Sequence, residues 1–353
     1  MNNSKPGKIA PYQLFFILFV SRVVVSLTYV QSVSVGKMSA DLLISIFAAW
    51  ALSMIACIPA YLCAIKGKNP FNITWLAVLY ALYFIYFSAV NVSRFSYFAT
   101  SRLTPESSML FFIMAILLCA CYGAVMGLEG LGRFGAFCGV ILLLTVVIVV
   151  VFNIKNADSV NLFPIIRNTR TDIFKNILLL SSNSIEPALF LSLEDKVNGE
   201  KKKPLFLGIT ASYGVIFLLI LMCQLVMGFA SQVQAYPIFA LFQLASMGAM
   251  SRLDIFHIAF WVLAIFLKVS GLIYCSTLCI KKYKHSTKCI AASILSVAVA
   301  VIITMVVGMN MVNVTKIISV VMFIVYSVMI PLMSLFFIKK SRVDNIVEKM
   351  QDY

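Results

Sequence analysis

Long apolar segments follow one another along almost the whole chain, and they restrict its fold more than any other feature. Every backbone N–H and C=O inside hydrocarbon must be satisfied within the protein, so an apolar segment of spanning length forms an α-helix. Hydropathy marks ten such segments, at 12–34, 41–65, 72–99, 108–127, 134–154, 174–193, 205–230, 253–280, 289–309 and 315–338. The sequence therefore predicts an all-α polytopic membrane protein with ten transmembrane helices, forming one integral membrane domain over residues 1–353.

Composition argues against a soluble enzyme. The chain is 62% hydrophobic and 12% charged, with a mean hydropathy of +1.00, which no ordinary soluble domain shows. The longest stretches between the apolar segments, 155–173 and 194–204, are too short for a catalytic domain. Neither His257 nor His285 belongs to a nucleophile or metal-ligand pattern, and the chain has no P-loop or dinucleotide fingerprint. We therefore expect no enzyme activity, no cofactor and no bound metal.

The distribution of Lys and Arg predicts the orientation in the membrane. With the N-terminus in the cytoplasm, the inside loops and termini hold 17 of these residues and the outside loops hold 8. Both termini are therefore expected in the cytoplasm. The net charge of +15 mostly reflects this asymmetry, and basic runs such as 201–203 are expected to touch anionic headgroups of the membrane lipid. No folded basic domain supports nucleic-acid binding.

Polar residues interrupt the sixth apolar segment near its middle, where residues 181–187 read SSNSIEP. A carboxylate at mid-membrane depth costs about 2.5–3.5 kcal/mol on insertion scales, so Glu186 is expected to have a partner or to line a polar cavity. Pro187 lacks a backbone donor and disfavours helix at the residue before it. We therefore expect a broken helix that borders a ligand pocket near the membrane midplane; a kinked helix, with its polar residues tied up in packing, is the alternative. The candidate ligand-binding residues here are Ser182, Asn183, Ser184 and Glu186.

The first apolar segment carries a comparable interruption, in which Arg22 lies about as deep as the acidic residue of the sixth. The ten spans divide into two halves, about 12–154 and 174–338, that begin on opposite sides of the membrane. An odd number of spans per half requires inverted topology if the halves share a fold, and interrupted first helices then indicate a substrate site. Ser21, Arg22 and Ser26 are therefore candidate ligand-binding residues as well. The alternative is that Arg22 snorkels toward the cytoplasmic headgroups.

A further cation lies close to the middle of the eighth segment. Lys268 or Arg22 is expected to neutralise Glu186 and to stabilise a closed state, which makes Lys268 and Glu186 candidate ion-site or gating residues. A structural ion pair with no part in ligand binding is the alternative.

The third segment contributes two tyrosines and an arginine. Tyr83 and Tyr86 lie at mid-span, where they are expected to form an aromatic wall over a ligand; core packing and interfacial anchoring are the alternatives. Arg94 lies nearer the outer side. We expect it either to attract an anionic ligand, as a third ion-site or gating residue, or to pair with a neighbour.

Five stretches carry a resemblance to a known family. They read IAPYQLFF at 9–16, GLEGLGRF at 127–134, NLFP at 161–164, SIEPALFL at 184–191 and RLDIFHIAFW at 252–261, and the basic run 201–203 follows the fourth. In this order they resemble the spore-germination permeases, the B subunits of germinant receptors, which belong to the amino acid–polyamine–organocation superfamily of transporters. The resemblance covers most of the chain.

The resemblance implies ten helices in an inverted 5+5 LeuT-like repeat with broken helices 1 and 6. It also implies a small nutrient ligand of the amino-acid class, partner A and C germinant-receptor subunits, and the bacterial cytoplasmic membrane, here the inner membrane of a spore. In this superfamily helix 8 faces helix 1 near a cation site, so the Lys268 ammonium is expected to stand in for sodium. One departure is that the superfamily usually has glycines where helix 1 unwinds, whereas residues 22–26 read RVVVS.

The expected function is therefore that of a germinant-receptor membrane subunit, which binds a nutrient in a midplane pocket and signals germination, with gating of an ion flux as one route. The alternative is an amino-acid permease that is proton-coupled through Glu186 or uncoupled. A third class, a scaffold without a ligand, predicts that neutralising Glu186 leaves function intact.

Overall fold

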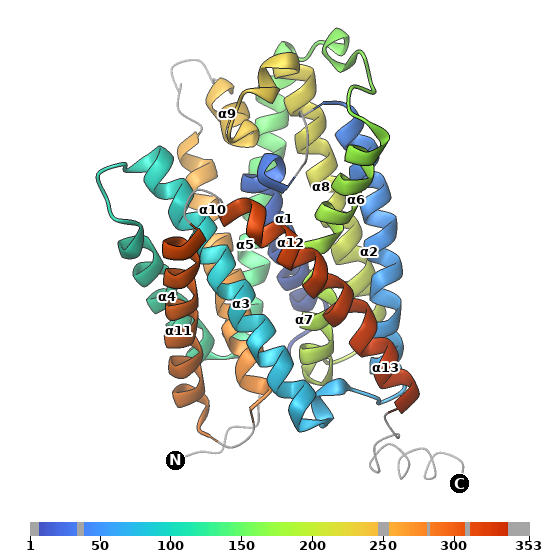
Figure 1. Cartoon of the computed structure of the whole chain (residues 1–353), viewed down its shortest axis with the longest axis vertical. Coiled ribbons are helices and arrows are strands. Elements are labelled where there is room, and N and C mark those ends of the chain that lie inside the picture. The colour runs from blue at the N-terminus through green and yellow to red at the C-terminus, as the bar shows by residue number, and fades with distance from the viewer. Residues whose placement is uncertain (1–6, 34–38, 246–253, 281–282, 308–310, 338–353) are drawn as a thin grey trace.

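Helices make up nearly all of the computed structural model, which describes residues 7–33, 39–245, 254–280, 283–307 and 311–337 (Figure 1). The α-helices are α1 (Pro11–Val33), α2 (Asp41–Ile65), α3 (Thr74–Phe98), α4 (Met109–Met126), α5 (Leu128–Asn153), α6 (Arg170–Ser182), α7 (Glu186–Leu193), α8 (Lys202–Met227), α9 (Pro237–Leu244), α10 (Asp254–Leu278), α11 (His285–Ile302), α12 (Met311–Phe323) and α13 (Ile330–Phe337). Within these residues no strand occurs, and the one β-type pairing is an isolated bridge between Ile9 and Val197.

Eight helical stretches in the described residues are long and apolar enough to cross a membrane. The chain is therefore an integral, multi-pass membrane protein, as the hydropathy predicts. Eight of the ten predicted spans match these stretches, and the last of them runs through a π-helical turn, Ile324–Met329, that joins α12 to α13. The first and sixth predicted spans differ from the rest, and each has its own physical reason.

The sixth predicted span is two half-helices, which confirms the predicted break. The 13-residue α6 ends at Ser182, and the 8-residue α7 begins at Glu186. Pro187 occupies the second position of α7, where its missing N–H leaves no helical hydrogen bond unmade. The connection is closed by a hydrogen bond from Ser184 N to Ser181 O of 2.9 Å. Carbonyl groups of α6 and N–H groups of α7 thus face one another inside the protein.

The first predicted span differs from the prediction of a broken helix, because α1 runs as one helix from Pro11 to Val33. The sequence RVVVS at 22–26 contains neither Gly nor Pro, so nothing in it removes a backbone donor or favours an open backbone. The valines keep helical geometry here. Ser26 lies in this helix, but its side chain is outside the described residues.

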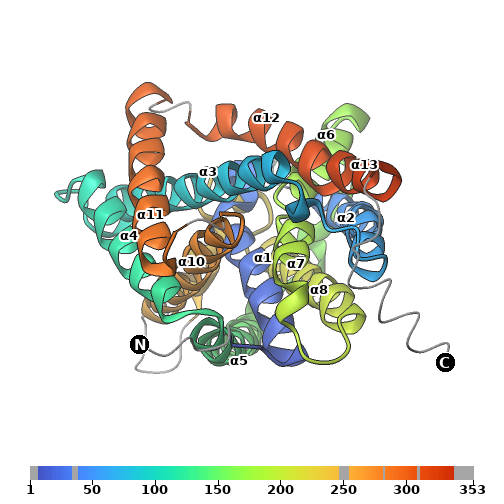
Figure 2. The same cartoon turned by 90° about the horizontal axis from the view of Figure 1, so that it is seen from below.

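The helix α1 occupies the centre of the bundle, between α5, α8 and α10 (Figure 2). Glycines on α5 make the close approach possible: a Cβ on Gly139 would lie 2.1 Å from the Phe16 ring, and one on Gly132 would lie 3.1 Å from Ile9. Small residues of this kind let membrane helices pack with their backbones close together. The position of α1 places Ser21 and Arg22 at the centre of the molecule.

A short backbone pairing joins the start of α1 to the chain that follows α7. Ile9 N donates to Lys196 O and Asn198 N donates to Ile9 O, both at 2.9 Å. This short parallel pairing attaches the start of α1 to the chain that follows α7. A buried acid reinforces the same region: Glu194 accepts from Lys201 Nζ at 3.1 Å and from Asn69 Nδ2 at 3.5 Å.

The opposite end of the molecule is covered by α9, which packs against α1, α5, α8 and α10 (Figure 1). Aromatic side chains fill the space beneath it. Trp261 is fully buried with its ring centroid 4.1 Å from that of Phe98, and His257 lies 4.5 Å from Phe242 in the same measure. This packing separates the centre of the bundle from that side of the membrane.

Candidate functional site

Glu186 is the first residue of α7 and its side chain is buried at the break, with 1% of its surface exposed. The Ser184 hydroxyl and the backbone N–H of Glu186 are neighbouring donors, but neither carboxylate oxygen completes a well-formed hydrogen bond among the described residues. The N-terminus of α7 favours negative charge there. A buried carboxylate is nevertheless costly without donors, so this group is poised for a ligand, a water molecule or a proton.

Arg22 lies across from this carboxylate and binds the end of α6. Its Nη2 donates to Leu180 O and to the Tyr213 hydroxyl, and its guanidinium carbon lies 4.6 Å from the centroid of the Tyr213 ring. Carbonyls at a helix C-terminus favour a cation, so Arg22 caps α6. Arg22 is 2% exposed, and the structure therefore differs from the alternative in which it snorkels to the headgroups. Its Nε and Nη1 have no partner in the described part of the chain.

Lys268 joins α10 to α1. Its Nζ donates to Ser21 O at 2.8 Å, and the side chain is 3% exposed. Both Lys268 and Arg22 interact electrostatically with Glu186. Within the described ranges the direct ion pairs are Lys201–Glu194 and Lys203–Glu200, so neither cation forms a direct ion pair with Glu186, and the neutralisation of Glu186 by either of them stays a prediction. The physical reason is that each buried cation has taken a main-chain carbonyl as its partner.

A hydroxyl network, which the sequence analysis missed, connects these groups. Ser53 Oγ lies 3.1 Å from Ser184 Oγ and 2.7 Å from the Tyr213 hydroxyl oxygen, and Ser327 Oγ donates to Ser184 O at 3.4 Å. These residues come from α2, α8 and the π-helical turn. A single Ser or Tyr in an apolar span is common, so the sequence carries no signal that separates them from packing residues.

Of the two predicted tyrosines on α3, one lies near Glu186 and the other lies one turn farther along the helix. Tyr83 is 1% exposed, stacks on Tyr326 with ring centroids 4.4 Å apart, and interacts electrostatically with Glu186. Tyr86 is half-buried, packs edge-on against Phe87, and its hydroxyl has no partner among the described residues. Tyr83 thus forms a wall near the acid, and Tyr86 lies one turn farther along α3.

Of the remaining predicted residues, Arg94 and Asn183 contact each other, and Ser182 forms a hydrogen bond within its own helix. Arg94 donates to Thr315 Oγ1 at 2.9 Å and to Asn183 Oδ1 at 3.5 Å, so it holds the break from the α3 side. Ser182 Oγ donates to Leu179 O at 2.8 Å within α6. Ser21, Arg22, Ser184, Glu186 and Lys268 are therefore brought together, whereas Asn183 and Arg94 form a neighbouring group.

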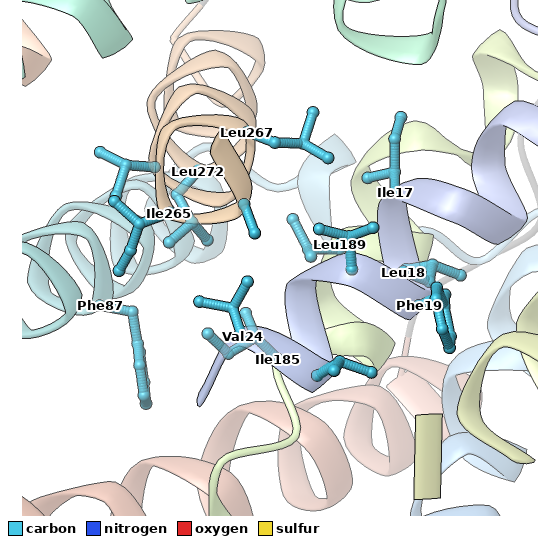
Figure 3. Close-up of a cluster of buried hydrophobic side chains, with 14 of the residues drawn as sticks. Ile17, Leu18, Phe19, Val24, Phe87, Ile185, Leu189, Ile265, Leu267 and Leu272 are labelled. Carbon is cyan, nitrogen blue, oxygen red and sulfur yellow. The ribbon is translucent and has the colours of Figure 1, made fainter. Parts of the chain in front are cut away.

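The cavity beside Lys268 is small in this conformation. The cavity that adjoins Ser21 and Lys268 has a volume of about 10 Å³, which is room for one water molecule. Side chains from α1, α3, α10 and the α6–α7 connection, among them Val24, Phe87 and Ile185, belong to one buried apolar cluster (Figure 3). The cavity beside Lys268 is therefore too small for an amino acid in this conformation, and the midplane pocket at Glu186 stays a prediction.

A larger hollow of about 510 Å³ lies next to this small cavity, at the end of the molecule where α1 begins. Its lining includes Glu129, Lys196 and His285. The two spaces share Leu128 and Tyr274, so these two side chains form the partition between them. The described residues contain no group of three or more His, Cys, Asp or Glu side chains that could hold a metal ion.

Comparisons with known proteins bear on this arrangement. Residues 8–310 match the model of a family of spore permeases, described as "Spore germination protein". A comparison with curated protein sequences finds no match.

Two solved structures share the fold. A Na⁺-coupled sialic acid symporter, in a substrate-bound outward-open state, is 13% identical with a TM-score of 0.63, over 91% of this chain and 79% of the symporter. Mhp1, a nucleobase-cation-symport-1 family transporter in a closed conformation with bromovinylhydantoin bound, is 12% identical with a TM-score of 0.57, over 84% of this chain and 74% of Mhp1. At these identities the likeness shows the fold alone, the predicted LeuT-like arrangement. The family and fold neighbours are transporters or receptors rather than enzymes.

Proposed function

Because this chain belongs to the spore germination permease family, we propose that it is the membrane subunit of a germinant receptor and binds a small nutrient at the broken sixth span. The observation that carries the proposal is the buried Glu186 carboxylate, whose two oxygens complete no well-formed hydrogen bond among the described residues although two cations, the Ser184 hydroxyl and a helix N-terminus surround it. A transporter-like membrane protein retains such a group at mid-depth when a ligand or an ion completes it. The proposed location is the inner membrane of a spore, with both termini in the cytoplasm.

The chemistry of the site supports a ligand of the amino-acid class. An α-ammonium group is a donor for both oxygens of Glu186, and an α-carboxylate is an acceptor for the unpartnered Nε and Nη1 of Arg22. Opposite charges at the two ends of one small molecule thus match opposite charges in the site. Tyr83 supplies an aromatic wall beside the acid.

Signalling follows from the closed packing of the site. A ligand that fits between Arg22 and Glu186 competes with the hydrogen bond from Arg22 to Leu180 O, which holds the end of α6. Ligand binding then favours an arrangement in which the half-helices have moved, and it shifts the population by the difference in its affinity for the two states. Partner A and C subunits, or an ion path through this chain, carry the signal onward in this proposal.

An amino-acid permease is the second candidate. The observation that favours it is the hollow lined by Glu129, Lys196 and His285, which shares the lining residues Leu128 and Tyr274 with the cavity beside Lys268. The two solved structures named above are cation-coupled transporters by their titles. In this candidate function Glu186 is the group that binds the coupling proton.

One experiment tests the receptor proposal directly. Spores that lack this chain are complemented with the wild type, with Glu186→Gln or with a matched Glu106→Gln, and germination is followed against a panel of amino acids. We expect Glu186→Gln to need at least about tenfold more amino acid, because a charge-assisted hydrogen bond to the ligand is worth roughly 1.5–3 kcal/mol. Glu106→Gln, at an exposed position, is expected to behave as the wild type.

Protein levels in the spore membrane are measured for each variant. A Glu186→Gln strain with normal levels and a normal response to every amino acid sinks the proposal and favours a scaffold. Uptake of labelled amino acids into proteoliposomes that contain this chain alone separates the second candidate: concentrative accumulation supports a permease, and binding without uptake supports a receptor.

A further inference from the structure

A groove separate from the candidate site lies between α3, α10 and α11. It has a volume of about 380 Å³, within the range of pockets that hold small molecules. Its floor is buried and mostly apolar, formed by Ile85, Thr277 and Ala292. Its rim is exposed, and Ala291 and Leu295 of α11 lie on it. In a chain that spans a membrane, such a rim faces the acyl chains of the bilayer.

Cations lie at one end of the groove without acidic partners. Lys288 lines it, and its Nζ is held by bonds to Thr277 O at 2.9 Å and Ile280 O at 2.7 Å. Lys284 is exposed at the start of α11, one turn away. Neither lysine forms an ion pair in the part of the chain that the structure describes. The groups that act on Lys288 are the thiols of Cys289 and Cys279 and a further cation, Lys196.

The end of α11 adds further donors to these cations. Lys284 is its N-cap residue and makes no side-chain cap bond, so first-turn N–H groups of an 18-residue helix are available to an anion. From Lys284 to Leu295 the helix rises about 16 Å at 1.5 Å per residue. That is close to the hydrocarbon depth of one leaflet, about 15 Å. The groove therefore has positive charge at one end and an apolar lining about one leaflet long. These features match the headgroup and the acyl chain of a single lipid molecule.

We propose that this groove is a binding site for one anionic phospholipid, with an acyl chain along Ile85 and Ala292 and the phosphate at Lys284 and Lys288. The apolar length of the groove selects a lipid rather than a free phosphate, because a soluble anion has no contact with it. The uncompensated cations select an anionic headgroup over a zwitterionic one, since each basic residue near a membrane surface favours negative lipid charge. This site is independent of the amino-acid proposal.

The test uses the full-length chain, purified in a neutral detergent and stripped of lipid. Binding of phosphatidylglycerol and of phosphatidylcholine is titrated for the wild type, Ala291→Trp and Lys284→Gln. Ala291→Trp fills the rim, and we expect it to weaken phosphatidylglycerol binding at least about fivefold. Lys284→Gln is expected to weaken it about fivefold by loss of one headgroup charge.

Matched variants control for general effects on the surface. Ile294→Trp places the same bulk on an exposed position of α11 outside the groove lining, and Lys155→Gln removes a different exposed charge. Both are expected to bind phosphatidylglycerol as the wild type does. Circular dichroism and gel filtration show that each variant is folded, so that a loss of binding is local.

Three results would overturn the proposal. The first is equal affinity for phosphatidylcholine and phosphatidylglycerol, and the second is unchanged binding in both groove variants. The third is full competition by glycerol phosphate, which has no acyl chain and identifies a site for a free anion. A photoactivatable acyl chain on phosphatidylglycerol should cross-link to α10 or α11; cross-linking confined to other helices counts against the site as well.

Discussion

At the scale of single residues, the sequence identified the charged side chains of the site but not their hydrogen-bond partners. The spacing of polar residues in apolar spans identified Arg22, Glu186 and Lys268, because charge at mid-depth is rare and stands out. It did not identify their partners, since each cation takes a main-chain carbonyl that any residue type could supply. Ser53 and Tyr213 were missed for a related reason: uncharged hydroxyls in a span carry no distinctive signal.

Lys268 offers a test at this scale. If its ammonium stands in for a cation at the junction of α1 and α10, removing it leaves the carbonyl of Ser21 and the Glu186 charge facing an unfilled position. We expect Na⁺ to raise the melting temperature of purified Lys268→Ala by about 2 °C or more relative to choline at equal ionic strength, because a bound ion stabilises the folded state. The wild type should show no such difference.

A control for this test is Lys316→Ala, which removes a lysine from α12. This variant should respond to Na⁺ and choline alike. A Na⁺ effect of equal size in the wild type, or none in Lys268→Ala, would show that the ammonium does not occupy a cation position.

At the scale of elements, the sequence predicted the break of the sixth span and mispredicted one in the first. The difference is local chemistry: Pro187 removes a donor, whereas the valines after Arg22 keep theirs. Polarity alone indicates depth and function, but it does not indicate an open backbone. The halves at 12–154 and 174–338 therefore differ in their first helices, and the inverted repeat itself stays a prediction.

The end of α7 provides a pH-dependent element outside the span. Burial, followed by the charge of Asp195, raises the pKa of Glu194 from 4.5 to about 7, although Lys201 acts to lower it. The folded state therefore holds this proton more tightly than the unfolded chain does. Stability from this group is fully present below about pH 4.5 and is lost as the pH rises through 7, where the carboxylate ionises in a buried position.

We expect the wild type to lose thermal stability between pH 5 and pH 8 by an amount on the order of 2 kcal/mol, and Glu194→Gln to lose distinctly less. Melting followed by tryptophan fluorescence across this range measures the difference. Glu200→Gln, at an exposed neighbouring acid, is the matched control and should follow the wild type. Parallel pH profiles for Glu194→Gln and the wild type would contradict the assignment.

At the scale of the whole molecule, hydropathy predicted the class and nearly all of the spans, because lipid leaves a chain few alternatives. It did not predict which state the bundle adopts. That depends on side-chain packing at particular places, such as Trp261 under α9 and Ile185 against α1, and the energies of open and closed packings differ by little.

The partition at Leu128 and Tyr274 is the test at this scale, and a natural cysteine reports on it. Cys275 lines the small cavity beyond the partition and is fully buried. We expect Leu128→Ala to join the two hollows and to speed labelling of Cys275 by a small water-soluble thiol reagent several-fold, as followed by mass spectrometry of the labelled peptides.

Cys223, buried in α8, lines neither cavity and serves as the internal control. Its labelling should stay slow in both proteins. If Cys275 and Cys223 accelerate together, the substitution has loosened the whole bundle and the partition is not where the structure places it; if neither changes, Leu128 does not separate the two spaces.

The pairing of Ile9 with the chain after α7 has a mechanical consequence. Two backbone hydrogen bonds connect the start of α1 to the chain that follows α7. Neither helix can therefore tilt on its own without breaking them. A tilt that lets water reach Glu186 from this end of the molecule must therefore move the start of α1 and the end of α7 together. The start of the chain is therefore expected to move together with the end of α7.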